Sequence, residues 1–367
     1  MTFTLSADLP GGSDTRVAIT DDELDGVTSK WESSDAIALF DFGKVFSMTN
    51  GSTAKNALCL GYEKDITPDD LGIDYASFKS TGRTRAKMGE TAANAQNFAL
   101  MYPYSKFASL PCSATSVEMD FTDQNGRLNE KDVTNIEKNF FYAWGYALGI
   151  CNDAEVDLIE GQEKCSSNLP WHGHGGEKII LDNKMAIIRF SLVGGETNNL
   201  KTLSEFLGSD EVRYIDIENT EDDVPGFSKA RVDLQSGLVT ATDGATNVLR
   251  VTPVPIDGKQ FKEITKGNAT PSYAGGPGVA WGSTFYLAVP CPRDKVLPFH
   301  PLLTIHTTGG KVYYGSLQSK DIKEGDYYMT APIRVFNNEV EIDDQAQIYL
   351  YYHSSYVWNG NNTIDIY

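Results

Sequence analysis

Apolar and polar residues alternate with a period of two over many short segments of this chain. The alternation is clear in Ala36–Phe42 and in 178–193 (KIILDNKMAIIRFSLV), where Ile188 and Phe190 lie on one face and Arg189 on the other. A period of two is typical of β-strands. The same pattern recurs at 212–217, 230–234, 239–241, 285–289, 303–307, 311–317 and 327–335. We therefore expect a chain built mainly of strands.

The connections between these segments are short or rich in turn residues. The 33 Gly and 15 Pro are spread along the whole chain, as turn residues between many strands would be. Such connections suit antiparallel hairpins and Greek keys rather than parallel crossovers. The sequence therefore predicts an all-β fold of sandwiches with few short helices.

The length of 367 residues is too great for one ordinary core and suits two domains. The segment 166–177 (SSNLPWHGHGGE) interrupts the strand pattern with Gly, His and Pro. We place the boundary there, which gives a first domain at 1–177 and a second at 178–367. The second domain includes an aromatic-rich C-terminal segment at 338–367.

Two segments depart from the strand pattern. Residues 129–148 have mixed periodicity and are expected to include a helical turn starting near Asp132. Residues 200–207 (LKTLSEFL) predict a short helix, with Thr197 or Asn198 as its cap. Neither segment is long enough to change the class.

Charge limits the partners of the protein. Fifty acidic residues against 31 basic ones give a formal net charge of −19, and the acidic residues are dispersed. Nucleic acid and anionic membranes both require clustered Lys and Arg, so we expect neither as a partner. A surface of this charge repels its own copies, so any polymerisation requires specific contacts.

The chain contains no apolar run near the roughly 20 residues that span a bilayer. Its first residues, MTFTLSADLPGGSD, lack the basic and apolar regions of a signal peptide. A cytosolic protein and a mature exported protein without its leader both fit this start, and we expect the second.

The five cysteines have no CxxC or zinc-finger spacing. Cys151 and Cys165 could close a local disulfide in an oxidising compartment. For most of the five we expect buried free thiols, because a lone Cys packs as a small apolar side chain. They are Cys59, Cys112, Cys151, Cys165 and Cys291.

Two stretches carry potential metal ligands. His172, His174 and Glu177 form HGHGGE, which resembles a zinc ligand set but lies on a Gly-rich connector, so we expect an exposed loop without metal. Residues 119–132 are rich in Asp, Asn and Glu, yet their spacing departs from a calcium loop. We expect a solvated acidic turn there, with Asn125-Gly126 at its tip.

Catalytic motifs are absent from the sequence. It has no GxSxG, HExxH, phosphate loop or dinucleotide-binding fingerprint. Carboxylate pairs for glycoside hydrolysis can lie far apart in a chain, and some will occur by chance among 50 acidic residues. We expect no enzyme activity and no cofactor.

An ordered series of short motifs covers most of the chain, and each motif alone is common in β proteins. It consists of Thr15-Arg16, Trp31 and Asp35 before a strand, FALMYPYSK at 98–106, NKMAIIRFSL at 183–192, VRYIDIENT at 212–220, RVDLQSGLV at 231–239, FYLAVPC at 285–291, LTIHTTGGKVYYGSL at 303–317 and KEGDYYMTAPIRV at 323–335. The order of these motifs resembles the Bacteroidetes fimbrillin family, the subunits of type V pili. Trp31 and Asp35 are expected to pack and to hold a turn rather than to act in function.

The resemblance implies two transthyretin-like β-sandwich domains, export as a lipoprotein to the outer membrane, and other fimbrial subunits as partners. It also implies assembly by strand exchange, in which cleavage after a basic residue removes a first strand and another subunit's strand fills the groove. Arg16 is the candidate cleavage site, and residues 3–9 (FTLSADL) are the candidate displaced strand. Alternatively, Arg16 is a solvated residue at a strand end.

The C-terminal segment is aromatic on both faces. Residues 346–367 (AQIYLYYHSSYVWNGNNTIDIY) predict two final strands joined by a turn at 359–362. Alternatively, they form an element between subunits or a platform that stacks on a sugar, with Tyr356 and Trp358 as possible contacts to a ligand or partner on a host or bacterial surface. A surface glycan-binding lipoprotein that does not polymerise is the second functional hypothesis.

Overall fold

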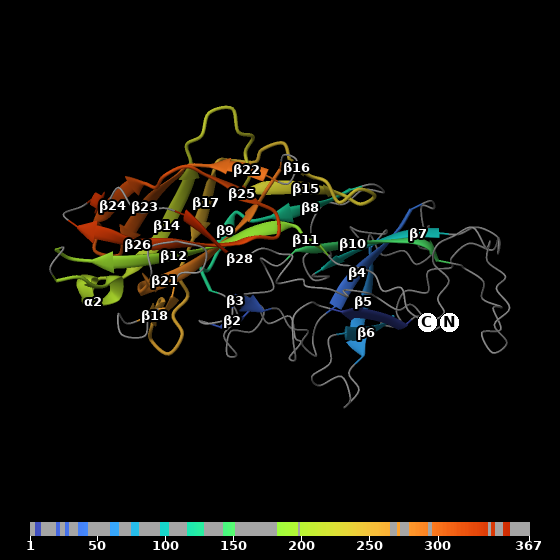
Figure 1. Ribbon diagram of the computed structural model, residues 1–367, viewed down its shortest axis with the longest axis horizontal. Helices are drawn as coiled ribbons and strands as arrows, with labels where there is room; N and C mark the ends of the chain where they lie inside the picture. The colour runs from blue at the N-terminus through green and yellow to red at the C-terminus, as the bar shows by residue number, and fades with distance from the viewer. Residues whose placement is uncertain are drawn as a thin grey trace.

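The computed structural model describes part of the chain in detail. The described residues are 4–8, 20–22, 26–28, 36–42, 59–65, 75–80, 96–102, 116–127, 142–150, 182–196, 199–264, 270–271, 279–292, 296–336, 339–341 and 348–352. Strands make up most of the regular structure in these residues, which confirms the all-β sandwich class. Figure 1 shows β4, β5, β6 and β7 on one side of the molecule, and most strands from β12 onward on the other, together with β9.

The early strands form a seven-stranded antiparallel sheet, which we call the N-terminal sheet. Its order is β1-β6-β5-β4-β7-β10-β11. The predicted strand at Ala36–Phe42 is β4, in the middle of this sheet. The other members are β1 (Thr4–Asp8), β5 (Cys59–Asp65), β6 (Tyr75–Ser80), β7 (Gln96–Tyr102), β10 (Ala143–Ile150) and β11 (Asp182–Asn183). A separate hairpin joins β2 (Thr20–Asp22) to β3 (Gly26–Thr28).

The centre of the second half is a sheet in which the strands are buried on both faces. Every residue of β12 (Met185–Gly194) and of β21 (Gly282–Pro290) is buried. The predicted polar face of β12 is therefore inside as well, and the Arg189 side chain is fully buried. β12 pairs antiparallel with β21 and parallel with β26 (Tyr327–Phe336). The edges of the sheet are β18 (Lys262–Ile264), β13 (Lys201–Thr202), β27 (Glu339–Glu341) and β28 (Ile348–Tyr352).

A second sheet faces this one and alternates between buried and exposed positions, as the sequence predicts for a sheet with one solvated face. Its order is β24-β23-β14-β17-β9. The strands are β24 (Val312–Ser316), β23 (Pro301–Thr307), β14 (Val212–Asn219), β17 (Val248–Val251) and β9 (Asp123–Gln124). We call the two facing sheets the C-terminal sandwich. Their layers are seen in Figure 1.

Smaller sheets complete the C-terminal sandwich. One has the order β16-β15-β8, and the other two are pairs. Their strands are β16 (Val239–Ala241), β15 (Lys229–Asp233), β8 (Ser116–Asp120), β22 (Val296–Phe299) with β25 (Lys320–Lys323), and β19 (Thr270–Pro271) with β20 (Val279–Ala280).

The short helix predicted near 200–207 is α2 (Leu203–Leu207), but its cap differs from the expectation. Thr202 is the N-cap, and Glu205 completes a capping box with it. The box satisfies two free N–H groups at the first turn. The expected caps, Thr197 and Asn198, lie outside the described residues, as does the turn near Asp132.

Residues 116–127 belong to the first half of the sequence but lie in the C-terminal sandwich. We call this segment the arm. β8 of the arm pairs antiparallel with β15, and β9 pairs parallel with β17. The boundary near residue 177 falls outside the described residues and stays a prediction, while the strand pairing assigns the arm to the second half.

The solvated acidic turn expected at 119–132, with Asn125-Gly126 at its tip, is wrong for the described part, 119–127, while 128–132 lie outside the described residues. Gln124, Asn125 and Arg127 are each no more than 6% exposed, and Gly126 is buried between the two sheets. The acidic pattern alone suggests solvent, but long-range packing of the segment buries its polar side chains.

A second junction joins the two halves beside the arm. The buried Lys184 ammonium lies 2.5 Å from Oε1 of Glu324 and 5.3 Å from the Trp144 ring centroid. Trp144 also donates a hydrogen bond to the Leu234 carbonyl at 3.0 Å. Its ring covers Gly237, where an added Cβ would lie 2.5 Å from the ring. The start of β10 is thus packed on the turn between β15 and β16.

Cys291 is a buried free thiol, as expected. Cys59 is the first residue of β5, and Cys112, Cys151 and Cys165 lie outside the described residues. Among the described residues, no helix is long and apolar enough to span a membrane.

Candidate functional site

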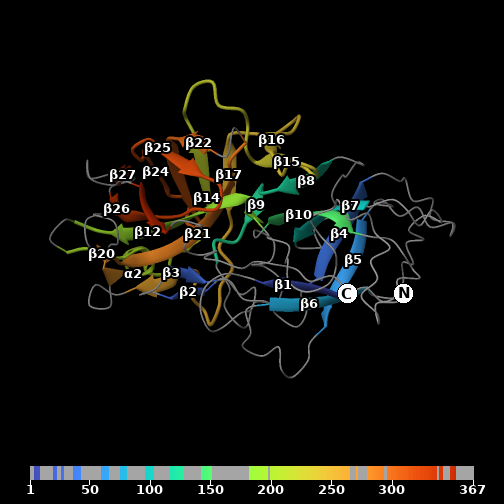
Figure 2. The same ribbon diagram turned by 45° about the vertical axis from the view of Figure 1, so that its right-hand side comes forward.

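The candidate displaced strand lies at an edge of the N-terminal sheet. Residues 4–8 form β1, which pairs antiparallel with β6 from Thr4↔Lys79 to Asp8↔Tyr75. Among the described strands, β6 is its one partner, and β6 pairs on its other side with β5. Figure 2 shows β1 and β6 side by side at the margin of the sheet. Residues 4–8 of the segment predicted from alternation at 3–9 therefore form a strand at an edge of the described sheet.

An edge position decides what the loss of β1 would do. An edge strand is held by one ladder of backbone hydrogen bonds, and its removal leaves the N–H and C=O groups of the next strand unpaired. Those groups on β6 would form a template for another strand of the same direction. Arg16 lies outside the described residues, so its exposure and its place relative to β1 stay predictions.

A second candidate is the solvated face of the β24-β23-β14-β17 sheet. Three registers place its outward side chains in one row across four strands, with Arg250 opposite Asp216, Asp216 opposite Thr304, and Thr304 opposite Tyr314. The adjacent row carries Tyr214 opposite His306 and His306 opposite Val312. We call these side chains the outer face.

Contacts within the outer face fix the side chains at its centre. The rings of Tyr214 and His306 are stacked with centroids 4.4 Å apart. The Arg250 guanidinium lies 4.0 Å from the centroid of the Tyr214 ring and binds both carboxylate oxygens of Asp216, at 2.7 and 2.8 Å. These hydrogen bonds and the negative charge of Asp216 raise the pKa of Arg250. Bidentate geometry of this kind positions both partners.

The edge strand β24 presents two exposed apolar side chains on this face. Tyr314 is 57% exposed and Val312 is 39% exposed. Tyr314 lies in the same row as Asp216 and Arg250, and strand β23 lies between Tyr314 and this pair. An exposed aromatic ring can stack on the apolar face of a sugar ring, while polar groups farther along the row bind its hydroxyls. The outer face therefore has the chemistry of a saccharide platform.

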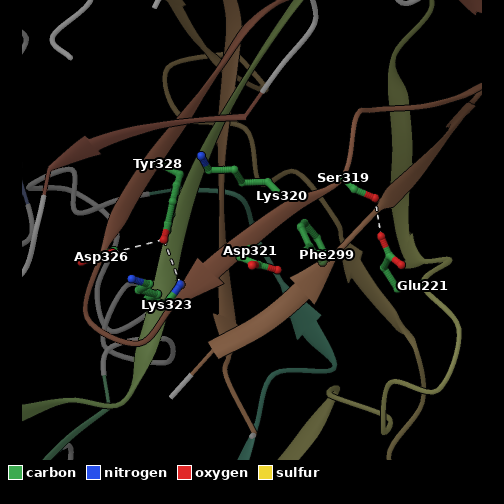
Figure 3. Close-up of a pocket in the computed structure, with 8 residues that line it drawn as sticks. All are labelled: Glu221, Phe299, Ser319, Lys320, Asp321, Lys323, Asp326 and Tyr328. Carbon is green, nitrogen blue, oxygen red and sulfur yellow. Dashed lines mark hydrogen bonds between the residues drawn. The ribbon is translucent and has the colours of Figure 1, made fainter. Parts of the chain in front are cut away.

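The third candidate is a hollow of about 510 Å³ beside β25, which Figure 3 shows with its lining residues. The Tyr328 hydroxyl donates to Asp326 Oδ2 at 3.2 Å and accepts from the Lys323 N–H at 2.8 Å. Burial raises the pKa of Tyr328, so its hydroxyl stays protonated. The lining residues are Glu221, Phe299, Ser319, Lys320, Asp321, Lys323, Asp326 and Tyr328.

Acidic and basic side chains both line the hollow, and a buried aromatic ring lines it as well. Lys320, Asp321 and Lys323 are exposed, whereas Phe299 is fully buried. Ser319 closes one side by donating its hydroxyl hydrogen to Glu221. Mixed charges in a hollow of this size suit a neutral polar ligand better than an ion of either sign. In the part of the chain that the structure describes, no group of three or more His, Cys, Asp or Glu could hold a metal ion.

Several predicted sites fall outside the described residues. They are Arg16, Tyr356, Trp358, Trp31, Asp35, Cys151, Cys165 and the HGHGGE segment. The structure instead brings together Tyr214, Arg250 and Tyr314, which sequence reasoning did not single out. The sequence KVYYGSL predicts an alternating strand that contains Tyr314. Alternation alone does not say which of its two adjacent tyrosines points to solvent.

Comparison with known proteins gives no family. No family model matches the chain, and no curated protein matches it. The fold is similar to solved structures of candidate cell adhesion proteins from Bacteroides ovatus (13% identity, TM-score 0.46, 89% of this chain and 91% of that one) and Bacteroides uniformis (13%, 0.45, 94% and 98%). A third, from Bacteroides eggerthii, has 12% identity and a TM-score of 0.32, with 98% and 91% covered. Similarity at this level does not establish a shared function.

Proposed function

We propose that the protein is a structural or adhesive subunit of cell-surface fimbriae that assembles by strand exchange. The observation that carries the proposal is the position of β1, an edge strand with one partner. The fimbrillin-like order of motifs along the sequence supports the same reading, and with it export as a lipoprotein to the outer membrane. We expect other fimbrial subunits as partners, no cofactor and no catalysis.

Removal of β1 would work through the backbone of β6. Cleavage after Arg16 would detach a segment that contains β1. The backbone groups of β6 at 75–79, which face β1 in the intact chain, would then be available to a strand from another subunit. Because a net charge of −19 opposes association at long range, the acceptor edge would have to supply both affinity and register.

The test is limited trypsin digestion followed by electron microscopy, with R16Q as the control. We expect the wild type to lose residues 1–16 and then to form ladders or fibres, while R16Q keeps its N-terminus and stays monomeric. A chain that is cut at Arg16 but never assembles would overturn strand exchange.

A cysteine pair makes the test specific for the departure of β1. Ser6 and Ser77 are opposite each other in the β1–β6 register. In the S6C/S77C variant, a disulfide should hold β1 in place after cleavage and block assembly, and a reducing agent should restore assembly. Assembly of the oxidised variant at the wild-type rate would show that the vacated edge of β6 is not the acceptor.

The outer face favours a second function, binding of a surface glycan without polymerisation. Its support is the exposure of Tyr314 in the same row of side chains as Asp216 and Arg250. A glycan array should show binding that Y314A loses and Y314F keeps, because stacking requires the ring and not the hydroxyl. Equal binding by Y314A would reject the outer face as the site.

A further inference from the structure

The backbone pairing that holds the arm comes from strands far away in the sequence. Its β8 pairs with β15 from Lys229↔Asp120 to Asp233↔Ser116. Its β9 continues to β17, where the Arg250 N–H donates to the Thr122 carbonyl at 3.1 Å and the Thr252 N–H to the Gln124 carbonyl at 2.7 Å. The arm therefore covers two edges of the C-terminal sandwich that would otherwise be unpaired.

The arm also contributes side chains to the core. Val117, Met119 and Phe121 alternate along it, and each is fully buried. Burial of these side chains removes apolar surface from water and so stabilises the arm on the sandwich. Phe121 packs on the Tyr142 ring with centroids 5.1 Å apart. Without an arm, the C-terminal sandwich would expose the apolar surface that these three side chains cover.

Two hydrogen bonds between the Gln124 side chain and the Ala288 backbone fix the end of the arm on β21, and we call them the Gln124 clip. The Gln124 side chain accepts a hydrogen bond from the Ala288 N–H and donates one to the Ala288 carbonyl, both at 2.8 Å. The Gly126 carbonyl accepts from the Tyr286 N–H at 2.9 Å. Gly126 has a φ of +75°, and an added Cβ there would lie 2.7 Å from Val251. This fit sets one register and one direction for the arm.

The chain on either side of the arm is long. Thirteen residues (103–115) separate β7 from the arm, and fourteen (128–141) separate the arm from the next described residue, Tyr142. An extended chain covers at most about 3.3–3.6 Å per residue, so each connection can reach across on the order of 40 Å. The contacts of the arm with β15, β17 and β21 do not require it to belong to the same chain.

We propose that the arm is exchangeable, and that the groove formed by β15, β17 and β21 accepts the arm of a second copy of this chain. The two arrangements make the same contacts, so the balance between them is set by concentration. Copies that fold at high concentration would form arm-exchanged dimers, and copies that fold in dilute solution would keep their own arms. The inference does not depend on the proposed fimbrial function, because it uses neither β1 nor Arg16.

The test uses two full-length chains with tags of different size. One chain carries E118C and the other R231C. These two residues face each other across β8 and β15, and their side chains form an exposed ion pair at 3.0 Å. The chains are unfolded, mixed, refolded together at several concentrations and then oxidised. A disulfide between the two tagged chains can form in register only if one chain's arm lies on the other chain's β15.

The matched control replaces R231C with T240C. Thr240 is exposed on β16, on the other side of β15 from the arm. The native cysteines are present in both mixtures, so background exchange is the same. We expect about tenfold more heterodimer from E118C with R231C than from the control, and a dimer-to-monomer ratio that rises in proportion to concentration.

The E118C/R231C double variant in one chain completes the experiment. It should form a disulfide within the chain at low concentration, which shows that the arm folds in register. If the double variant closes within the chain at every concentration and the mixed single variants give no heterodimer above the control, the arm is fixed in its own chain and the proposal is overturned.

Discussion

The arm and β1 are both strands from the first half of the chain, and the structure holds them differently. β1 pairs with one neighbour at the edge of a sheet. The arm pairs with two strands, places Val117, Met119 and Phe121 in the core, and is clipped to a third strand by Gln124.

The difference separates two ways in which a strand can be exchanged. A strand held by one backbone ladder can leave while the rest of its sheet stays folded, because the sheet loses only an edge. A strand that fills the core cannot leave without unfolding its acceptor, so its exchange has to occur during folding. We therefore expect β1 to be released from the folded protein and the arm to exchange only on refolding.

The largest loss of stability should come from replacement of Phe121. Replacing it with Ala removes a fully buried ring that contacts Tyr142. We expect F121A to lower the free energy of unfolding by about 3–5 kcal/mol, as measured by urea denaturation. L238A is the control, because Leu238 is 40% exposed and should change stability little. A loss in F121A no larger than in L238A would show that the arm is not part of the core.

The next largest loss of stability should come from removal of the Gln124 clip. Q124A leaves the N–H and carbonyl of Ala288 without their side-chain partner inside the protein. Buried groups left unpaired cost about 1–3 kcal/mol, and we expect a loss in that range. Hydrogen exchange at the Ala288 amide should also become faster. Q235A, at an exposed position, is the control for loss of an amide side chain. Unchanged protection of Ala288 in Q124A would contradict the clip.

Much of the fold was predictable from alternation alone. The strands at 36–42 and 239–241 have the predicted bounds, because turn residues flank an alternating run in each case. The arm was not predictable in this way. Gln124 and Ala288 are 164 positions apart, and the Asp-Gln-Asn-Gly pattern is the same in a solvated turn and in a buried clip. Local sequence gives strand content, while burial of polar residues is decided by distant partners.

The candidate sites also differ in whether local sequence or distant strand pairing determines them. The segment 3–9 could be predicted as a strand because its alternation is local, and its edge position came only from the pairing with β6. The outer face needs three strand registers to bring Arg250, Asp216 and Tyr314 into one row. No sequence pattern specifies three registers at once, so this site could not be predicted.

A smaller effect is expected from a proline in β1. Proline has no backbone N–H and is poorly tolerated within a ladder. S6P should weaken β1 while the rest of the N-terminal sheet stays paired, with a loss of about 1 kcal/mol or less in stability. Trypsin should remove the N-terminal segment faster from S6P than from the wild type.

The matched control is S77P. Ser77 is opposite Ser6 on one side and Asp65 on the other, so proline there disturbs two ladders. S77P should therefore cost more stability than S6P. Equal losses in the two variants would show that β1 contributes as much as an internal strand, and the contrast between β1 and the arm would fail.

The smallest loss of stability should come from replacement of Asp120, at the end of the pairing between the arm and β15. Burial acts to raise the pKa of this carboxyl, but hydrogen bonds from Thr122 and the charge of Lys229 outweigh it, so the pKa is lowered. The Thr122 N–H donates to Oδ1 at 2.9 Å, and Lys229 Nζ lies 3.4 Å from Oδ2. A folded pKa below the unfolded one means that the carboxylate stabilises the fold above the unfolded pKa, and that this contribution is lost as pH falls through the folded pKa.

D120N should therefore be slightly less stable than the wild type at neutral pH, by about 0.5 kcal/mol for a partly exposed pair, and equal to it in acid. Asn keeps an oxygen that can accept from Thr122, so the difference isolates the charge. Urea midpoints of both proteins from neutral pH to about pH 2 measure it. In a K229Q background the difference should shrink, because the cation that favours the carboxylate is gone. If D120N is destabilised equally at all pH values, the Asp120 charge does not hold the arm, and its side chain acts there only as a hydrogen-bond acceptor.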